Sequence, residues 1–92
     1  MPRVFKLGPY LVYFWTNEGL PPEPVHVHVT DGVPSKDDTK IWITSAGGAM
    51  VCHNKGDIPD HRLHEILDIL GSQSLYIVGR WKDVFGDAKF YC

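Results

Sequence analysis

Hydrophobic and polar residues alternate one by one along residues 25–30, Val-His-Val-His-Val-Thr. Successive side chains of a β-strand point to opposite faces of the sheet. The pattern therefore predicts a strand whose three valines face a core, while His26, His28 and Thr30 share the other face. Residues 21–24 contain three prolines and predict an irregular approach to this strand, because proline has no backbone N–H to donate.

A second alternating stretch, residues 39–44, has Ile41 and Ile43 on one side and Lys40 and Trp42 on the other. Side chains directly opposite each other on paired strands lie close enough to interact. If the two stretches pair with their aliphatic side chains inward, Lys40 and Trp42 become neighbours of the two histidines. We expect these four side chains to form one exposed sheet surface.

Short apolar stretches predict three further strands, at residues 4–7, 10–15 and 49–53. Gly8-Pro9 marks a turn between the first two, and the branched and aromatic residues around it suit a half-buried sheet. Residues 10–15 are apolar on both faces, so the pattern does not show which face is inside. Cys52, in the last stretch, is expected to be a small buried side chain.

From residue 57 onward, apolar residues recur with the spacing of one helix face in two stretches. In the first they are Leu63, Ile66, Leu67 and Leu70. In the second they are Ile77, Val78, Trp81 and Phe85. Asp57 is expected to cap the first helix, which ends near Gly71. Ser72 or Ser74 is expected to cap the second, which ends at Gly86.

Strands first and helices afterwards predict a single α+β domain over residues 1–92. Residues 1–53 are expected to form an antiparallel sheet of four to five short strands, and two helices in residues 57–86 to pack on one of its faces. Residues 87–92 are expected to form a short strand or a tail. A chain of 92 residues is long enough for one modest core.

The composition excludes several classes of protein. A hydrophobic content of 43% and a charged content of 22% are typical of a globular chain rather than a disordered one. A formal net charge of −2 lacks the basic excess of a nucleic-acid binder, although a local basic patch remains open. Two cysteines and the absence of a long apolar stretch favour a cytoplasmic protein without a membrane partner.

Specific motifs follow one another along nearly the whole chain: Phe5-x-x-Gly8, Asn17-Glu18, the histidine strand of residues 24–29, Lys40-Ile41-Trp42, Asn54-Lys55-Gly56, Trp81 and Phe85-Gly86. In this order they resemble the small bacterial family described as domain of unknown function 4160, although Val25 stands where its members usually carry proline. The resemblance implies a small α+β domain, often encoded beside another short protein and proposed as half of a toxin–antitoxin-like pair. It implies no particular reaction.

The favoured hypothesis for function is an interaction module that binds a protein encoded by a neighbouring gene, with nucleic acid as an open alternative. The expected binding residues are His26, His28, Lys40, Trp42, Glu18 and Asn54. The simplest alternative is a solvated polar face without a ligand, because polar residues commonly point outward from a half-buried sheet.

A second hypothesis is a metal-independent ribonuclease. His26 and His28 would serve as general acid and general base, because histidine titrates near neutral pH. Lys40 would stabilise the developing charge and Trp42 would stack a base. The acidic net charge argues against this hypothesis, because phosphate neutralisation supplies much of the affinity for nucleic acid.

A third hypothesis is a metal-binding regulator. Alternate residues of a strand point to the same side, so His26 and His28 could chelate one ion, with His53 as a further ligand. A single His-x-His lacks the dense ligand spacing of a zinc signature, and we therefore expect no cofactor.

Overall fold

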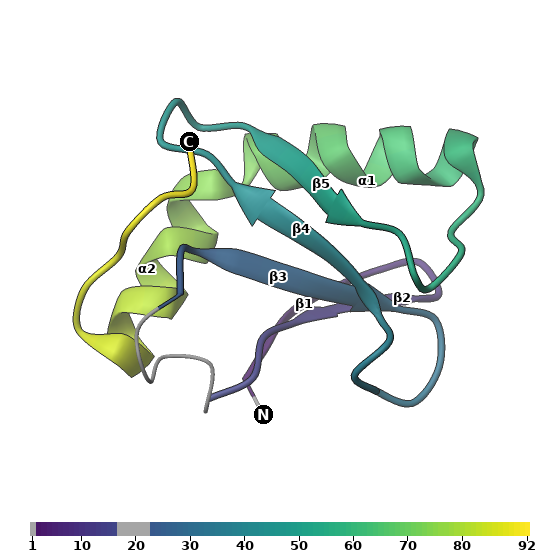
Figure 1. The fold of residues 1–92 in the computed structure, drawn as a ribbon, viewed down its shortest axis with the longest axis horizontal. Helices are drawn as coiled ribbons and strands as arrows, with labels where there is room; N and C mark the ends of the chain where they lie inside the picture. Colours follow the sequence, from purple (N-terminus) through teal and green to yellow (C-terminus); the bar gives the residue numbers. More distant parts are fainter. Residues whose placement is uncertain (1, 17–22) are drawn as a thin grey trace.

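Five strands form one antiparallel sheet and two helices follow it in the computed structural model, which describes residues 2–16 and 23–92 (Figure 1). The strands lie in the order β1-β2-β3-β4-β5. They are β1 (Arg3–Leu7), β2 (Tyr10–Tyr13), β3 (His26–Thr30), β4 (Thr39–Ile43) and β5 (Ala49–His53). The helices are α1 (Asp60–Ser72) and α2 (Ser74–Phe85). The predicted α+β architecture, with strands first and two helices on the sheet, is confirmed.

The valines and isoleucines of the central strands share one face of the sheet, as the alternation predicts. Val27 pairs with Ile41, and Val29 pairs with Val12 on β2. This face packs against the apolar faces of both helices, and the resulting core holds the following fully or nearly fully buried side chains: Val12, Phe14, Val25, Val27, Val29, Ile41, Ile43, Ile66, Leu70, Ile77 and Trp81. Val12 and Phe14 therefore point into this core, and the opposite face of β2 is buried as well.

The beginnings of the two helices differ from the prediction. Asp57 adopts a left-handed backbone conformation, with φ 56, so α1 begins only at Asp60, with Pro59 at the N-cap position. Gln73 alone separates the helices, and neither start has a side-chain cap hydrogen bond, so the predicted serine cap is absent. Gly86, with φ 80, ends α2 as predicted, because glycine adopts the left-handed conformation at little cost.

Residues 87–92 continue beyond α2 without forming a helix or strand. In Figure 1 this yellow segment runs alongside the sheet from the end of α2 towards the turn between β4 and β5. Cys52 is exposed, so its predicted burial is wrong; it lies on β5, an edge strand with a neighbour on one side only. Among the residues that the structure describes, no helix has the length and apolar content to cross a membrane.

The helix layer supplies a direct test of this packing. Ile77 is completely buried on α2, whereas Leu75, two residues earlier, is 88% exposed. Replacing Ile77 with alanine should lower the free energy of unfolding by about 2–5 kcal/mol, because it leaves a cavity between helix and sheet. Leu75→Ala should change it by no more than about 0.5 kcal/mol. Urea unfolding measures both, and equal losses would show that α2 does not pack as described.

Candidate functional site

The polar face of the sheet is a grid of side chains on β3, β4 and β5. One row is formed by His28, Lys40 and His53, and the next by His26, Trp42 and Met50, as the strand register dictates. We call these six residues the histidine–indole face: His26, His28, Lys40, Trp42, Met50 and His53. The predicted clustering of the two histidines with Lys40 and Trp42 is confirmed.

The predicted exposure of the two histidines is wrong. His26 is 0% and His28 is 7% exposed, because aromatic rings pack around both. The ring of Tyr13 stacks on His28 at 5.5 Å between centroids. Trp42 lies 5.7 Å from His26 and meets it edge-on, and Trp81 of α2 lies 5.2 Å from the same imidazole. These histidines are therefore buried beneath aromatic side chains and do not form the exposed surface of the face.

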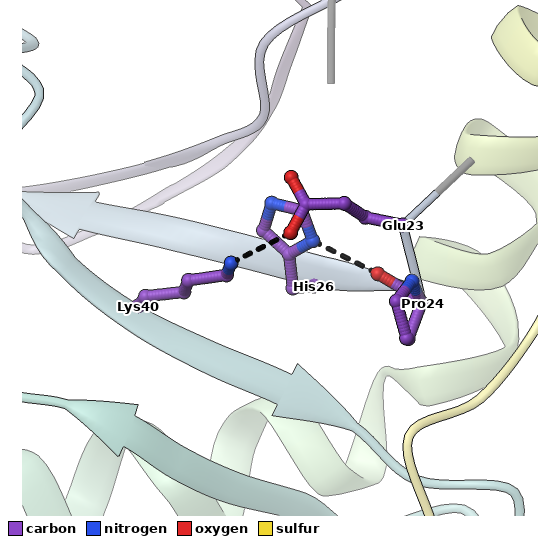
Figure 2. Close-up of polar contacts among 4 residues, drawn as sticks. All are labelled: Glu23, Pro24, His26 and Lys40. Atoms are coloured by element: carbon purple, nitrogen blue, oxygen red, sulfur yellow. Dashed lines mark hydrogen bonds and ion pairs between the residues drawn. The ribbon is translucent and has the colours of Figure 1, made fainter. Parts of the chain in front are cut away.

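Two polar contacts tie the segment before β3 to the face (Figure 2). The Nδ1 atom of His26 lies 2.9 Å from the carbonyl oxygen of Pro24; since a carbonyl only accepts, this nitrogen donates. The Nζ atom of Lys40 forms an ion pair with Glu23 at 2.9 Å. The same ammonium lies 4.6 Å from the centroid of the Trp42 ring, a cation–π distance. The ammonium group of Lys40 thus already interacts with a carboxylate and an indole ring.

A buried carboxylate supports the face from the loop between β3 and β4. Asp38 is 7% exposed and accepts hydrogen bonds from the Tyr13 hydroxyl and from the backbone N–H of Ser35 at 2.9 Å. These bonds fix the Tyr13 ring that stacks on His28. Sequence reasoning missed Tyr13 and the supporting role of Asp38, because the polar residues 31–38 predict only a loop.

His53 occupies the outer end of its row and is only partly exposed. Burial lowers the pKa of His53 below its ordinary value of 6.5, and the positive charges of Lys55 and Lys40 and the neighbouring His28 lower it further. The imidazole of His53 is therefore mostly neutral at pH 7. A neutral His53 and a paired Lys40 leave this row without the positive charge that a phosphate-binding site requires.

The two residues expected at the edges of the face have different outcomes. Glu18 lies outside the described residues. The side-chain oxygen of Asn54 accepts hydrogen bonds from the Thr39 hydroxyl at 2.6 Å and from the Ile58 N–H at 3.0 Å. Its amide nitrogen donates to the Ile58 carbonyl at 2.9 Å. Because the Asn54 side chain is engaged in the turn before α1, we assign it a structural role and leave it out of the proposed surface.

No group of three His, Cys, Asp or Glu side chains within residues 2–16 and 23–92 is arranged to hold a metal ion. His26, His28 and His53 lie on the same sheet face, but their strand positions spread them over two rows of the grid. The described geometry therefore gives the metal hypothesis no set of ligands.

A comparison with protein families finds the model described as a domain of unknown function (DUF4160), which matches residues 10–82. The chain belongs to this family. The matched part of the DUF4160 domain includes the histidine–indole face and ends just after Trp81. No curated protein and no solved structure matches the chain. The family match therefore carries no reaction with it.

The depressed pKa of His53 predicts a pH dependence with a defined sign. As the pH falls, the unfolded chain protonates this ring near pH 6.5, and the folded chain protonates it only at a lower pH. The contribution of the neutral ring to the free energy of unfolding is therefore fully present above pH 6.5. It is lost as the pH falls from 6.5 through the lower folded-state pKa. An NMR titration of the His53 ring should give a midpoint below 6.5, and Lys55→Ala should move it upward because a positive neighbour is removed.

Lys82→Ala, on α2, is the control and should leave the His53 midpoint unchanged. A His53 midpoint at or above 6.5 in the unmodified chain would contradict the described surroundings of this ring.

The packing of the turn before α1 predicts that two substitutions in it, at Asn54 and Gly56, lower the stability of the fold. Asn54→Ala removes the partners of the Ile58 backbone and should cost about 1–3 kcal/mol of stability. A Cβ added at Gly56 would lie 2.8 Å from Thr39 Oγ1 and 3.1 Å from the Thr39 backbone nitrogen, so Gly56→Ala should also destabilise. A Cβ added at Gly79 meets nothing within 4 Å, and Gly79→Ala in α2 should stabilise by about 1 kcal/mol. Thermal unfolding of the three variants separates these directions.

Proposed function

We propose that this DUF4160 domain is a non-catalytic interaction module that binds a protein partner through the outer half of the histidine–indole face. This half consists of Lys40, Trp42, Met50 and His53. The observation that carries the proposal is the Trp42–Met50 pair, which lies side by side on β4 and β5. Trp42 is partly exposed and Met50 is 39% exposed, although the adjoining β3 is buried throughout.

The chemistry of this pair favours a protein as the partner. Tryptophan and methionine are enriched in protein interfaces, and a tryptophan often carries much of the binding energy. The buried His26 ring lies against Trp42, so the indole is held in place before any partner arrives. A surface that is already ordered loses less entropy on binding.

The charges around the pair weigh against nucleic acid as the partner. Lys40 is paired with Glu23, and the lowered pKa of His53 keeps that imidazole mostly neutral at pH 7. The chain as a whole has a formal charge of −2, whereas affinity for a phosphate backbone comes largely from cationic side chains. The ribonuclease hypothesis also needs His26 and His28 to reach a phosphodiester, and their burial argues against it.

For the partner we propose a second small protein encoded by a neighbouring gene, as in a toxin–antitoxin-like pair in a bacterial cytoplasm. The family resemblance supports this setting. Which half of such a pair the chain would be does not affect the proposed surface, because either half would bury an aromatic patch against the other.

Calorimetric titration of the neighbouring gene's product tests the proposal. Trp42→Ala should weaken binding by about tenfold or more, corresponding to at least about 1.4 kcal/mol. Met50→Ala should weaken it less, and Leu75→Ala, on the helix layer, should leave it unchanged. Thermal unfolding checks that each variant is folded.

Three results would contradict the proposal. They are unchanged binding by Trp42→Ala, loss of binding in Leu75→Ala, and cleavage of a short RNA by the purified chain that disappears when His26 and His28 are both replaced by alanine.

A further inference from the structure

Residues 87–92 lie against the sheet as an extended peptide. The backbone N–H of Val25, just before β3, donates to the Lys89 carbonyl at 2.8 Å. The N–H of Ser45, just after β4, donates to the Cys92 carbonyl at 2.8 Å. Between these two bonds the ring of Tyr91 stacks on Trp42, with centroids 4.8 Å apart and planes 4° from parallel. The segment thus contacts the central residue of the proposed binding surface.

These contacts are the kind by which proteins recognise extended peptides. Main-chain hydrogen bonds position a peptide whatever its sequence, and one inserted side chain provides selectivity. Here the sheet supplies the Val25 and Ser45 N–H groups and the Trp42 ring, and the segment supplies two carbonyls and the Tyr91 ring. The two peptide carbonyls are three residues apart, and the stacking residue Tyr91 directly precedes the second of them. This spacing defines the element that the surface accepts.

The segment is also only partly buried against the sheet. Tyr91 is 59% exposed and Phe90 is 37% exposed. A segment with few buried contacts opens at a lower free-energy cost than the core does. The surface beneath it belongs to β4, which is held by β3 and β5 on both sides, and therefore persists when the segment leaves.

We propose that residues 87–92 occupy the partner's site within the free chain, and that the partner presents an extended peptide whose aromatic side chain replaces Tyr91 on Trp42. The inference rests on the proposed function and specifies the chemistry of the partner. A nucleic-acid base would also stack on an indole, but the paired Lys40 and the acidic chain favour a peptide. While residues 87–92 occupy the site, the partner cannot bind, so its apparent affinity is reduced in proportion to the fraction of chains in which the site is open.

The experiment uses the full chain and a synthetic peptide with the sequence of residues 87–92, carrying serine instead of cysteine. Binding is followed by the NMR shift of the Trp42 indole N–H. Tyr91→Ala should bind the peptide about tenfold more tightly than the unmodified chain, the ratio expected when the segment covers the site about nine-tenths of the time. Tyr91→Phe, which keeps a stacking ring, and Phe90→Ala, outside the Tyr91–Trp42 stack, should both behave like the unmodified chain.

A peptide with alanine in place of its tyrosine should not bind to Tyr91→Ala. The inference is overturned if Tyr91→Ala and the unmodified chain bind the peptide equally, if the alanine peptide binds as well, or if an oligouridylate binds better than the peptide does. If Tyr91→Ala fails to fold, the unmodified chain still tests the inference: it should bind the tyrosine peptide and not the alanine peptide, and equal binding of the two peptides would overturn the inference.

Failure of this inference is distinguishable from failure of the proposed function. If Trp42→Ala abolishes binding of the neighbouring gene's product while Tyr91→Ala does not alter it, the surface is correct and the self-occupancy is wrong. If Trp42→Ala leaves that binding intact, the surface itself is wrong, whatever the peptide does.

Discussion

The polar face of β3 has to be covered, and the rest of the structure is arranged around this constraint. β3 lies in the middle of five strands, and both helices pack on its valine face. All five of its residues are buried, so its other face also lies away from water. The rings of His26 and His28 meet edge-on at 5.1 Å. Imidazoles suit this position because they pack as flat rings, and the Nδ1 atom of His26 still donates a hydrogen bond to the Pro24 carbonyl.

This covering produces a gradient of exposure across the sheet. On β3 the polar-face side chains are buried, on β4 Trp42 and Lys40 are partly exposed, and on β5 Met50 is exposed. Because the indole of Trp42 packs against the buried ring of His26, it has no room to become more buried. The same packing that protects the histidines therefore presents Trp42 outward on a rigid base, which is the geometry that a protein interface uses for its central residue.

The alternation of side chains was sufficient to predict most of the fold but not the surroundings of the histidines. Period-two stretches predict strands and their neighbours, so the pairing of His28 with Lys40 and of His26 with Trp42 followed from sequence. Exposure depends instead on long-range contacts, namely the Tyr13 ring above His28 and the Trp81 ring beside His26. No local pattern encodes these contacts.

Local signals failed in the turn before α1 for a related reason. Aspartate is a common helix-capping residue, so Asp57 was expected to cap α1. Instead, the hydrogen bonds of Asn54 to Ile58 and Thr39 fix a turn, and in this turn Asp57 has a left-handed backbone conformation. Helix-capping preferences are worth about 1 kcal/mol, and the several hydrogen bonds around Asn54 together exceed that value. One of these bonds comes from Thr39 on β4, which is distant in sequence and therefore not part of the capping pattern.

The chain's own segment 87–92 and a binding partner would compete for the same ring of Trp42. Tyr91 stacks parallel to the indole ring of Trp42, the central residue of the proposed surface. Any free energy that the chain gains by covering Trp42 with its own segment is subtracted from the affinity of an external ligand for that ring. A weakly held cover is therefore the arrangement that protects an apolar surface in the free protein and still yields to a partner. The exposed outer side of Tyr91 and the two main-chain bonds beside it are consistent with such a cover, and a deeply buried segment would not be.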